Sequence, residues 1–464
     1  MKGPLSPLFS PRSIALIGAS ASAGKISNVV LKNLLDSPFK VYPVNPREDE
    51  ILGAHCYPSV SSIPDEIDLA LIALPAMLSI RAVEDCIRKG VRIVIVTSSG
   101  FAESGQDGKI LQDGLRDLIG VSGTRLLGPN TMGLMVPFHG LDTLFIPVEK
   151  SRRPPAGSIA IISQSGAVAV SFLEKAESFG MGISACIGLG NRVDINENEL
   201  LEFFADDPNT DCVALYLESF ADGRSFVDIA RRISKIKPIV VLKAGRTSSG
   251  SRAASSHTGA LASDSDELVA GALRQAGVIR VYDDEELVDV ARVLAYKGKI
   301  DGDRVCVVAS AGGFGVIASD FVESKEHGVG MTMAGLSEET RARLSKTMPT
   351  FSSVNNPVDL TAEVTDLMYE QVLEALQEDP GIDVIMMSLE LQPPHVTQGL
   401  VDVAARRSSQ GRIPIIISAF GGSRTQETLR ALESRKIPSY PTIWRAIRAI
   451  AALHQRGSYL MKQK

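Results

Sequence analysis

The stretch Ser13-Ile14-Ala15-Leu16-Ile17-Gly18 decides the fold, because a short apolar run that ends in glycine is typical of a buried strand followed by a tight turn. Similar apolar runs recur through the first third of the chain, with helical patterns between them. They occupy residues 41–46, 69–75, 92–97 and 125–130. Continuous apolar runs that alternate with helices predict a parallel sheet covered on both faces.

The ends of these expected strands carry the residues that can form a binding site. In open parallel sheets, ligands bind outside the carboxyl ends of the strands. The residues that collect there are Gly18, Asn45, Pro75, Gly100 and Asn130. The sequence therefore predicts a ligand site at this edge of the first sheet.

Two further units follow the first. A Pro-rich, basic stretch at 150–155 predicts a linker, and the polar, Gly-containing stretch 298–303 predicts a second boundary. The second unit has expected strands at 157–162, 212–218 and 238–242 and a closing helix at 285–297, and the third has strands at 304–310, 384–389 and 414–418. The expected fold class is α/β, with three doubly wound units in series. The expected domains are 1–148, 156–298 and 303–464.

Composition excludes several classes of protein. A chain of 464 residues has room for about three domains of ~150 residues. Its hydrophobic content of 44% and charged content of 22% are those of an ordinary soluble globular protein. The net charge of −6 argues against a nucleic-acid surface, and no apolar run is long enough to cross a membrane.

Cysteine and histidine spacing predicts no metal site. The five cysteines are scattered without a CxxC pair, which indicates free thiols in a reducing cytoplasm. The histidines other than His257 are isolated in the sequence and lack the spacing of metal ligands.

The first glycine turn offers an anion site without a known fingerprint. Residues 18–28 fit neither a P-loop nor GxGxxG, since the glycine spacing is wrong and Ile26 follows Lys25 where Ser or Thr is required. Backbone amides at a helix start nevertheless bind phosphate, and Lys25 can add positive charge. An ordinary strand-to-helix turn remains the alternative.

Two more turns of small residues open the second and third units. They are Ser163-Gln164-Ser165-Gly166-Ala167 and Ala311-Gly312-Gly313-Phe314-Gly315. Small residues let a ligand approach the backbone, and the following helix offers free amides to an anion. Together the two turns could cradle one phosphate between two helix dipoles. The alternative is a pair of ordinary turns without a ligand.

His257 stands among small residues in Ser255-Ser256-His257-Thr258-Gly259-Ala260-Leu261, which we interpret as a loop. Neutral imidazole is a nucleophile near physiological pH, so this residue can carry a phosphoryl group. Glu218, at the end of an expected strand, can accept the Nδ1–H of a histidine and leave Nε2 free to attack. The alternative for Glu218 is a surface or helix-capping role.

At this point the chain resembles a known family. The matching motifs are Ser256-His257-Thr258-Gly259, Ser163-Gln164-Ser165-Gly166, Gly190-Asn191-Arg192-Val193-Asp194, Leu217-Glu218-Ser219 and Asn356-Pro357-Val358-Asp359. They resemble the α subunit of the NDP-forming acyl-CoA synthetases, which are the ADP-forming acetate–CoA ligases and relatives of succinyl-CoA synthetase. The resemblance covers nearly the whole chain, in the order Rossmann-like CoA-binding domain and two flavodoxin-like ligase domains.

The resemblance implies a chemistry and a set of site residues. Acyl-CoA and phosphate give an acyl phosphate and free CoA, the acyl phosphate phosphorylates a histidine, and the histidine passes its phosphoryl group to ADP. By resemblance, His257 is the carrier and Glu218 its orienting carboxylate. The implied phosphate-binding residues are Ser165, Gly166, Ala167, Gly312, Gly313 and Phe314. The implied CoA-binding residues are Gly18, Ser20, Lys25, Asn45, Arg47, Pro75, Gly100 and Asn130.

The nucleotide site of the family is missing from the expected domains. In the family an ATP-grasp domain, fused or on a separate β subunit, holds ADP or ATP with Mg²⁺, and the three units leave no room for one here. The resemblance therefore implies a separate ATP-grasp β subunit and a hetero-oligomer of two α and two β subunits. Asn191 and Asp194 lie near the acyl pocket or form a structural turn.

Two other functions compete with the synthetase. A CoA- or acyl-CoA-binding regulatory protein would keep this fold without the ligase chemistry, but such a protein needs neither His257 nor Glu218. An NAD(P)-dependent enzyme would need the GxGxxG turn and an acidic residue at the end of the second strand. The first turn does not fit GxGxxG, and the second strand ends in Asn45-Pro46-Arg47, so the sequence argues against this function.

Overall fold

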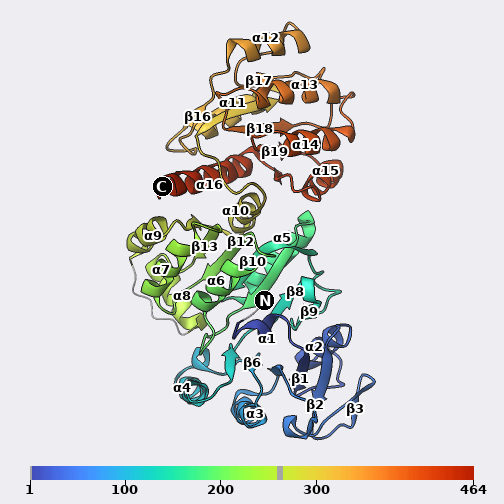
Figure 1. Cartoon of the computed structure of the whole chain (residues 1–464), viewed down its shortest axis with the longest axis vertical. Helices are drawn as coiled ribbons and strands as arrows, with labels where there is room; N and C mark the ends of the chain where they lie inside the picture. Colours follow the sequence, from blue (N-terminus) through green and yellow to red (C-terminus); the bar gives the residue numbers. More distant parts are fainter. Residues whose placement is uncertain (1–2, 259–264, 464) are drawn as a thin grey trace. The chain divides into compact units, whose positions relative to one another are not determined.

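The computed structural model describes residues 3–258 and 265–463, without the side chains of residues 255–258. Within these residues the chain forms three large sheets and one small two-stranded sheet (Figure 1). It divides into two compact units, Met1–Ser178 with Gly182–Asp284, and Phe179–Met181 with Glu285–Lys464. The first two large sheets belong to the first unit and the third belongs to the second unit. The chain is thus an α/β protein built from three doubly wound sheets, as predicted.

The first sheet has five parallel strands in the order β2-β1-β5-β6-β7. Every residue of β1, β5 and β6 is buried, which explains why these strands are apolar without alternation. The bounds are β1 Ser13–Ile17, β2 Lys40–Val44, β5 Leu69–Ile72, β6 Ile93–Val96 and β7 Arg125–Leu127. All five predicted strands are therefore present.

The second sheet has the order β14-β13-β12-β10-β11-β8-β9. Its strands are β10 Ala156–Ser163, β11 Ile183–Gly188, β12 Cys212–Leu217, β13 Ile239–Lys243, β14 Ile279–Val281, β8 Leu134–Val136 and β9 Leu141–Asp142. Five of them are parallel, while β8 pairs antiparallel with β11 and β9 antiparallel with β8. Residues 134–142, expected in the first domain, thus extend the second sheet.

The third sheet has the order β16-β15-β18-β19-β20, with β17 also paired to β15. Its strands are β15 Arg304–Ala309, β16 Thr332–Met333, β17 Val358–Asp359, β18 Val384–Leu389, β19 Ile415–Ala419 and β20 Ser439–Tyr440. All pairings are parallel.

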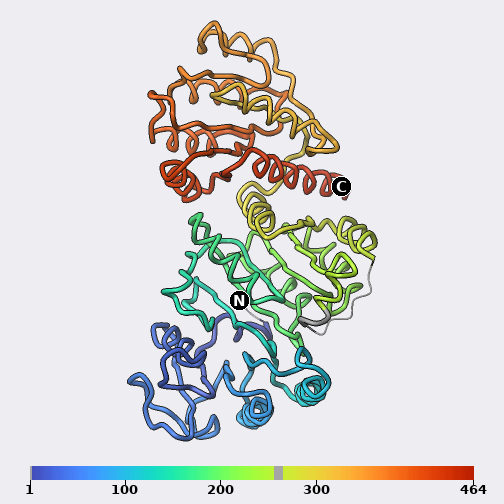
Figure 2. The backbone as a smooth tube through the Cα atoms, turned by 180° about the vertical axis from the view of Figure 1, so that it is seen from behind, coloured from blue at the N-terminus to red at the C-terminus, as the bar shows by residue number. Residues whose placement is uncertain are grey.

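Helices connect the strands (Figure 2 traces the same chain from behind). In the first unit they are α1 Ser6–Phe9, α2 Ile26–Leu35, α3 Ala76–Lys89, α4 Gln106–Gly120, α5 Gly166–Phe179, α6 Glu197–Asp206, α7 Gly223–Ile233, α8 Ser248–Thr258 and α9 Asp266–Gln275. Next come α10 Asp284–Lys297, α11 Gly312–Glu323, α12 Glu338–Thr347, α13 Asp366–Gln377, α14 Gly399–Gln410, α15 Ser423–Glu433 and α16 Ile443–Met461. The small elements are β3 Glu50–Ile51, β4 Ala54–His55 and the 3₁₀ turns η1 Val60–Ser62, η2 Ala102–Ser104 and η3 Pro137–His139.

Helix α10 groups with the third sheet, whereas the sequence places it at the end of the second domain. A buried ionic cluster explains the difference. Arg292 of α10 is fully buried and donates to Glu433 of α15 at 3.1 Å and to the Ser439 carbonyl at 2.8 Å. Arg445 of α16 donates to Asp289 of α10 at 2.6 Å. Breaking a buried charge pair on one side is strongly destabilising, so this cluster fixes α10 to the C-terminal unit.

All three sheets share one strand order. The parallel strands of each sheet can be numbered from 1 to 5 in the order in which they occur in the sequence, leaving out β17. Each of the three sheets then has the spatial order 2-1-3-4-5. The connections leave the first and third strands in opposite directions, so each sheet has a switch point between them, where ligands of such folds bind. The three switch points lie between β1 and β5, between β10 and β12, and between β15 and β18.

Candidate active site

The glycine turn after β1 is shaped by crowding at the first switch point. Gly18 has a φ of +87°, and its amide donates to the Val44 carbonyl at 3.0 Å. A Cβ at this position would meet the Ala73 carbonyl oxygen and the Leu74 side chain, each at 2.7 Å. Only glycine therefore fits where the ends of β1, β2 and β5 meet.

The other predicted CoA residues after β1 and β2 divide into those that hold the backbone and those that are exposed. Asn45 donates from Nδ2 to the Ala19 carbonyl at 2.9 Å and accepts the Arg47 amide at 2.9 Å, so it joins the ends of β1 and β2. Ser20 accepts the Ser22 amide at 3.2 Å. The side chains of Lys25 and Arg47 are exposed to solvent.

The remaining predicted CoA residues follow β5, β6 and β7. Pro75 precedes the first residue of α3. Gly100 has a φ of +102° and donates its amide to Glu103 Oε1 at 2.7 Å. Asn130, with a φ of +58°, donates its amide to the Ser98 carbonyl at 2.9 Å. The eight predicted residues thus lie beyond the carboxyl ends of the five strands of one sheet, and their role in binding CoA stays a prediction.

The turn after β10 carries the first predicted phosphate site. The Ser163 hydroxyl donates to the Ser165 carbonyl at 2.7 Å and accepts the Ser165 amide at 3.2 Å, which closes the turn. Helix α5 begins at Gly166, and Ala167 in its first turn is exposed. The first amides of a helix have no partner within it, so this turn can receive an anion.

Glu218 lies directly after β12, on the other side of the second switch point. It is 7% exposed, and its amide donates to Gln164 Oε1 at 2.5 Å. The Tyr216 hydroxyl donates to Glu218 Oε1 at 3.2 Å, and Lys243 Nζ donates to the Glu218 carbonyl at 2.7 Å. Burial, and then the Glu218 carboxylate, raise the pKa of Tyr216, so its hydroxyl keeps its proton and acts as a donor.

A buried ion pair fixes the loop that follows Glu218. Arg192 donates to the Ser219 carbonyl at 2.8 Å and to the Ser219 hydroxyl at 2.6 Å. It also pairs with Glu197 at 2.9 Å, and Glu197 accepts the Ala221 amide at 2.6 Å. Glu197 is fully buried, so the pair is shielded from solvent and holds the backbone in place.

His257 belongs to α8, which corrects the expectation of a loop. The helix begins at Ser248 and runs through the Ala- and Ser-rich stretch before His257. At its start, the Ser251 hydroxyl donates to the Gly245 carbonyl at 3.0 Å and the Ser251 amide to the Thr247 carbonyl at 2.8 Å. The backbone of His257 is in the last turn, whereas its side chain lies outside the described residues. Helix α8 lies beside η2, the turn that follows Gly100.

The turn after β15 carries the second predicted phosphate site. Helix α11 begins at Gly312, and both Gly312 and Gly313 are exposed. A Cβ on Gly312 would lie 3.0 Å from Asp359 Oδ2, so a small residue is favoured there. The Phe314 ring packs on Phe420 with the centroids 3.8 Å apart.

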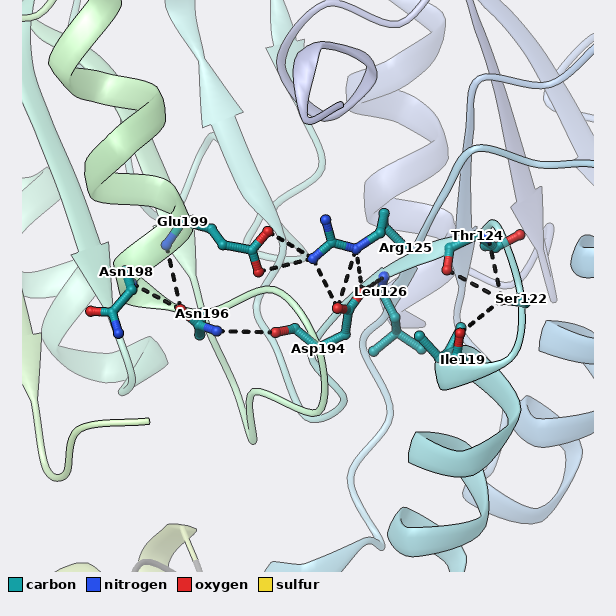
Figure 3. Close-up of polar contacts among 9 residues, drawn as sticks. All are labelled: Ile119, Ser122, Thr124, Arg125, Leu126, Asp194, Asn196, Asn198 and Glu199. Atoms are coloured by element: carbon teal, nitrogen blue, oxygen red, sulfur yellow. Dashed lines mark hydrogen bonds and ion pairs between the residues drawn. The ribbon is translucent and has the colours of Figure 1, made fainter. Parts of the chain in front are cut away.

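The segment 190–194 forms a structural joint between the first and second sheets (Figure 3). Asp194 accepts three bonds from Arg125 of β7, two at 2.9 Å and one at 3.2 Å, and the Leu126 amide at 2.8 Å. Glu199 of α6 also accepts from Arg125, at 2.8 Å. The hydrogen bonds to Asp194 raise the pKa of Arg125. Of the two roles open for Asp194, this geometry favours the structural turn.

Asn191 connects the same segment to η2. Its Nδ2 donates to Glu103 Oε2 at 2.6 Å and to Gln112 Oε1 at 2.8 Å. Burial alone would raise the pKa of Glu103, but the bonds from Asn191 and from the amides of Gly100 and Phe101 outweigh burial and lower that pKa.

The described residues contain no group of three or more His, Cys, Asp or Glu side chains that could hold a metal ion. The five cysteines are buried free thiols. No helix in the described ranges is long and apolar enough to cross a membrane.

Comparison with known proteins decides the family. Profiles described as a CoA binding domain, a succinyl-CoA ligase-like flavodoxin domain and a ligase-CoA domain match residues 12–137, 156–294 and 305–458. The chain is 37% identical to the α subunit of the ADP-forming acetate–CoA ligase I of Pyrococcus furiosus, over 99% of both chains. The chain belongs to the ADP-forming acetate–CoA ligase family.

One further relative has the same fold as this chain, and another is longer than this chain. The dinucleotide-forming acetyl-coenzyme A synthetase 1 of Candidatus Korarchaeum cryptofilum, solved with phosphate and ADP, superposes with a TM-score of 0.90 at 34% identity, over 99% of this chain and 98% of that one. The ADP-forming acetate–CoA ligase I of Archaeoglobus fulgidus is 36% identical over 98% of this chain, which spans 64% of that relative.

The sequence did not point to the residues that hold Glu218 and the following Ser219. Gln164 and Arg192 lie within motifs shared with the family, but nothing in their spacing points to Glu218. Tyr216 and Lys243 lie within apolar strands that carry no other signal. Their role became visible only from the hydrogen bonds.

Proposed function

We propose that this chain is the α subunit of an ADP-forming acyl-CoA synthetase. It interconverts acyl-CoA, phosphate and ADP with a carboxylic acid, CoA and ATP. The observation that carries the proposal is the buried Glu218, whose carboxylate accepts from Tyr216 and whose amide bonds to Gln164 ahead of α5, in a chain that aligns over 99% of its length with an α subunit of this family.

The reaction proceeds through two intermediates. A phosphate oxygen attacks the thioester carbonyl, the C–S bond breaks, CoA leaves and an acyl phosphate forms. His257 Nε2 then attacks phosphorus, and the carboxylate leaves with the electron pair of the broken P–O bond. Glu218 accepts the Nδ1–H bond and balances the positive charge that forms on the ring. ADP finally takes the phosphoryl group from the histidine.

The chain's own residues supply the binding of phosphate and CoA. The turns at Ser165, Gly166 and Ala167, and at Gly312, Gly313 and Phe314, hold phosphoryl oxygens at two helix starts. The amides of Ser165 and Phe314 already bond to Ser163 and Ala311, so the donors in these turns are the amides of Gly166, Ala167, Gly312 and Gly313. Lys25 and Arg47 are exposed cations that pair with the phosphates of CoA. The apolar side chains of Ile26 and Met77, 45% and 66% exposed at the starts of α2 and α3, fit a ligand that also has apolar parts.

We infer that the nucleotide site belongs to a separate ATP-grasp β subunit, which binds ADP or ATP with Mg²⁺. The length of the relatives supports this inference. The P. furiosus α subunit matches this chain over 99% of both, whereas the A. fulgidus ligase, which is not named as a subunit, is longer, and this chain spans 64% of it. The free cysteines fit a reducing cytoplasm, where we place the enzyme.

Labelling of the histidine tests the proposal. The chain is incubated with acetyl-CoA and ³²P-labelled phosphate, and protein-bound label is measured. We expect acid-labile label on the parent and on His327→Ala, whose histidine is exposed elsewhere, and none on His257→Ala. An unlabelled parent that still binds CoA would favour the regulatory alternative.

A further inference from the structure

Gln164 connects the two halves of the proposed site. It is 5% exposed, and its side-chain oxygen accepts two backbone amides, from Glu218 at 2.5 Å and from Ser219 at 3.1 Å. Gln164, in the turn before α5, and Glu218, in the turn after β12, are 54 positions apart in the sequence. One side chain therefore fixes the phosphate turn and the Glu218 turn to each other.

This connection lies at the point where strands β10 and β12 begin to separate. Ser163 is the last residue of β10 in register with β12, opposite Tyr216, and the Gln164 amide donates to the Tyr216 carbonyl at 3.1 Å. Beyond this point the pairing of β10 with β12 ends, because α5 leads toward β11 and α7 leads toward β13. The hydrogen bonds of Gln164 thus continue the contact between the two segments beyond the ends of the strands, into the turns that would hold the reacting groups.

We propose that Gln164 is a positioning residue that sets the distance between the phosphate turn and the Glu218 carboxylate. The inference rests on the proposed function, in which His257 attacks an acyl phosphate held at that turn while Glu218 orients the ring. The N–P bond forms as the P–O bond breaks and the carboxylate leaves. Misplacement of reacting groups by ~1 Å can slow such a step about 100-fold.

Single-turnover labelling with ³²P-acetyl phosphate separates this role from mere support of the fold. The rate constant of His257 labelling reports only folded molecules, whereas loss of folded protein lowers the amplitude. Gln164→Leu removes both acceptor bonds at similar volume. We expect its rate constant to fall about tenfold or more at saturating acetyl phosphate. Gln164→Asn, one methylene shorter, replaces the leucine variant if that variant does not fold.

A matched control is available in the second compact unit. Gln377 is also buried and also holds two backbone groups, accepting the Ile413 amide at 2.9 Å and donating to the Ile413 carbonyl at 2.7 Å. Gln377→Leu should therefore lower thermal stability by an amount similar to Gln164→Leu, and we expect it to keep the parent's rate constant.

Gln164→Glu supplies the rescue. A carboxylate accepts both amides, so we expect labelling about fivefold or more faster than in Gln164→Leu. Equal rate constants for Gln164→Leu and the parent would overturn the inference, as would a glutamate variant as slow as the leucine variant. A parent that takes up no label overturns the proposed function and this inference together.

Discussion

At the scale of single residues, the loops beyond the strands hold conformations that most residues avoid. Asn130 and Arg192 have φ values of +58° and +55° without being glycine. They lie in loops packed so closely that a Cβ on Gly190 would lie 2.1 Å from the Pro129 carbonyl oxygen. Such strain persists only where the surroundings fix it, and it concentrates at functional sites.

Gly18 gives a prediction with an internal control. Gly18→Ala combines a left-handed backbone with a steric clash, whereas Gly24→Ala, at a φ of +84°, places its Cβ in open space. We expect Gly24→Ala to cost about 1–2 kcal/mol of unfolding free energy and Gly18→Ala to cost about 1–3 kcal/mol more. Urea denaturation, with hydrogen exchange at β1 as the local readout, measures both. Equal costs would show that crowding at the switch point is unimportant.

At the scale of elements, burial decides what the sequence can predict. Strands such as β1, β5 and β6 are buried on both faces, so their apolar runs are continuous and were predictable. Strand β11, Ile183–Gly188, mixes small and polar residues, and β8 is three residues long, so neither has a clear pattern. The Ala- and Ser-rich stretch of α8 is equally compatible with loop and helix, and only its backbone hydrogen bonds distinguish them.

The candidate site shows the same limit. Gly18 and the turns before α5 and α11 were predictable because glycine and small residues mark turns in the sequence itself. Gln164, Lys243 and Arg192 were not, since each reaches Glu218 or Ser219 across at least 25 positions. Such contacts depend on strand order, which the sequence does not display.

The turn η2 gives a pH-dependent prediction. Hydrogen bonds lower the pKa of Glu103 below its ordinary value, so its ionised form stabilises the fold above the unfolded pKa of about 4.3, and this stabilisation is lost as pH falls through the folded pKa. Glu103→Gln should lower the free energy of unfolding by about 1 kcal/mol at pH 7. It should have no effect at a pH where Glu103 of the parent is protonated in both the folded and the unfolded state. Urea denaturation of parent and variant from pH 7 down to pH 3 measures the difference. A cost that does not change with pH would contradict the assignment.

At the scale of the whole molecule, one topology is used three times. With β17 set aside, the parallel strands of each sheet have the order 2-1-3-4-5. Each switch point carries one set of predicted residues: the Gly18 turn, the Ser165 and Glu218 turns, and the Gly312 turn. A switch point creates an opening at which helix starts and strand ends meet. The repetition gives one chain three such openings, at which we propose that CoA and phosphate bind.

The proposed division of the reaction between this chain and a separate ATP-grasp β subunit can be tested on the intact chain. If the nucleotide binds to that separate subunit, the chain alone should form no acyl-CoA from acetate, CoA and ATP, while it still takes label on His257 from acetyl-CoA and phosphate. Addition of an ATP-grasp β subunit should allow thioester formation, because the phosphoryl group can then pass from ATP on that subunit to His257 on this chain. The measurement is thioester formation with and without the added subunit, with His257→Ala as the inactive control. Robust ATP-dependent thioester formation by the chain alone would contradict the proposal, since a nucleotide site would then have to lie within this chain.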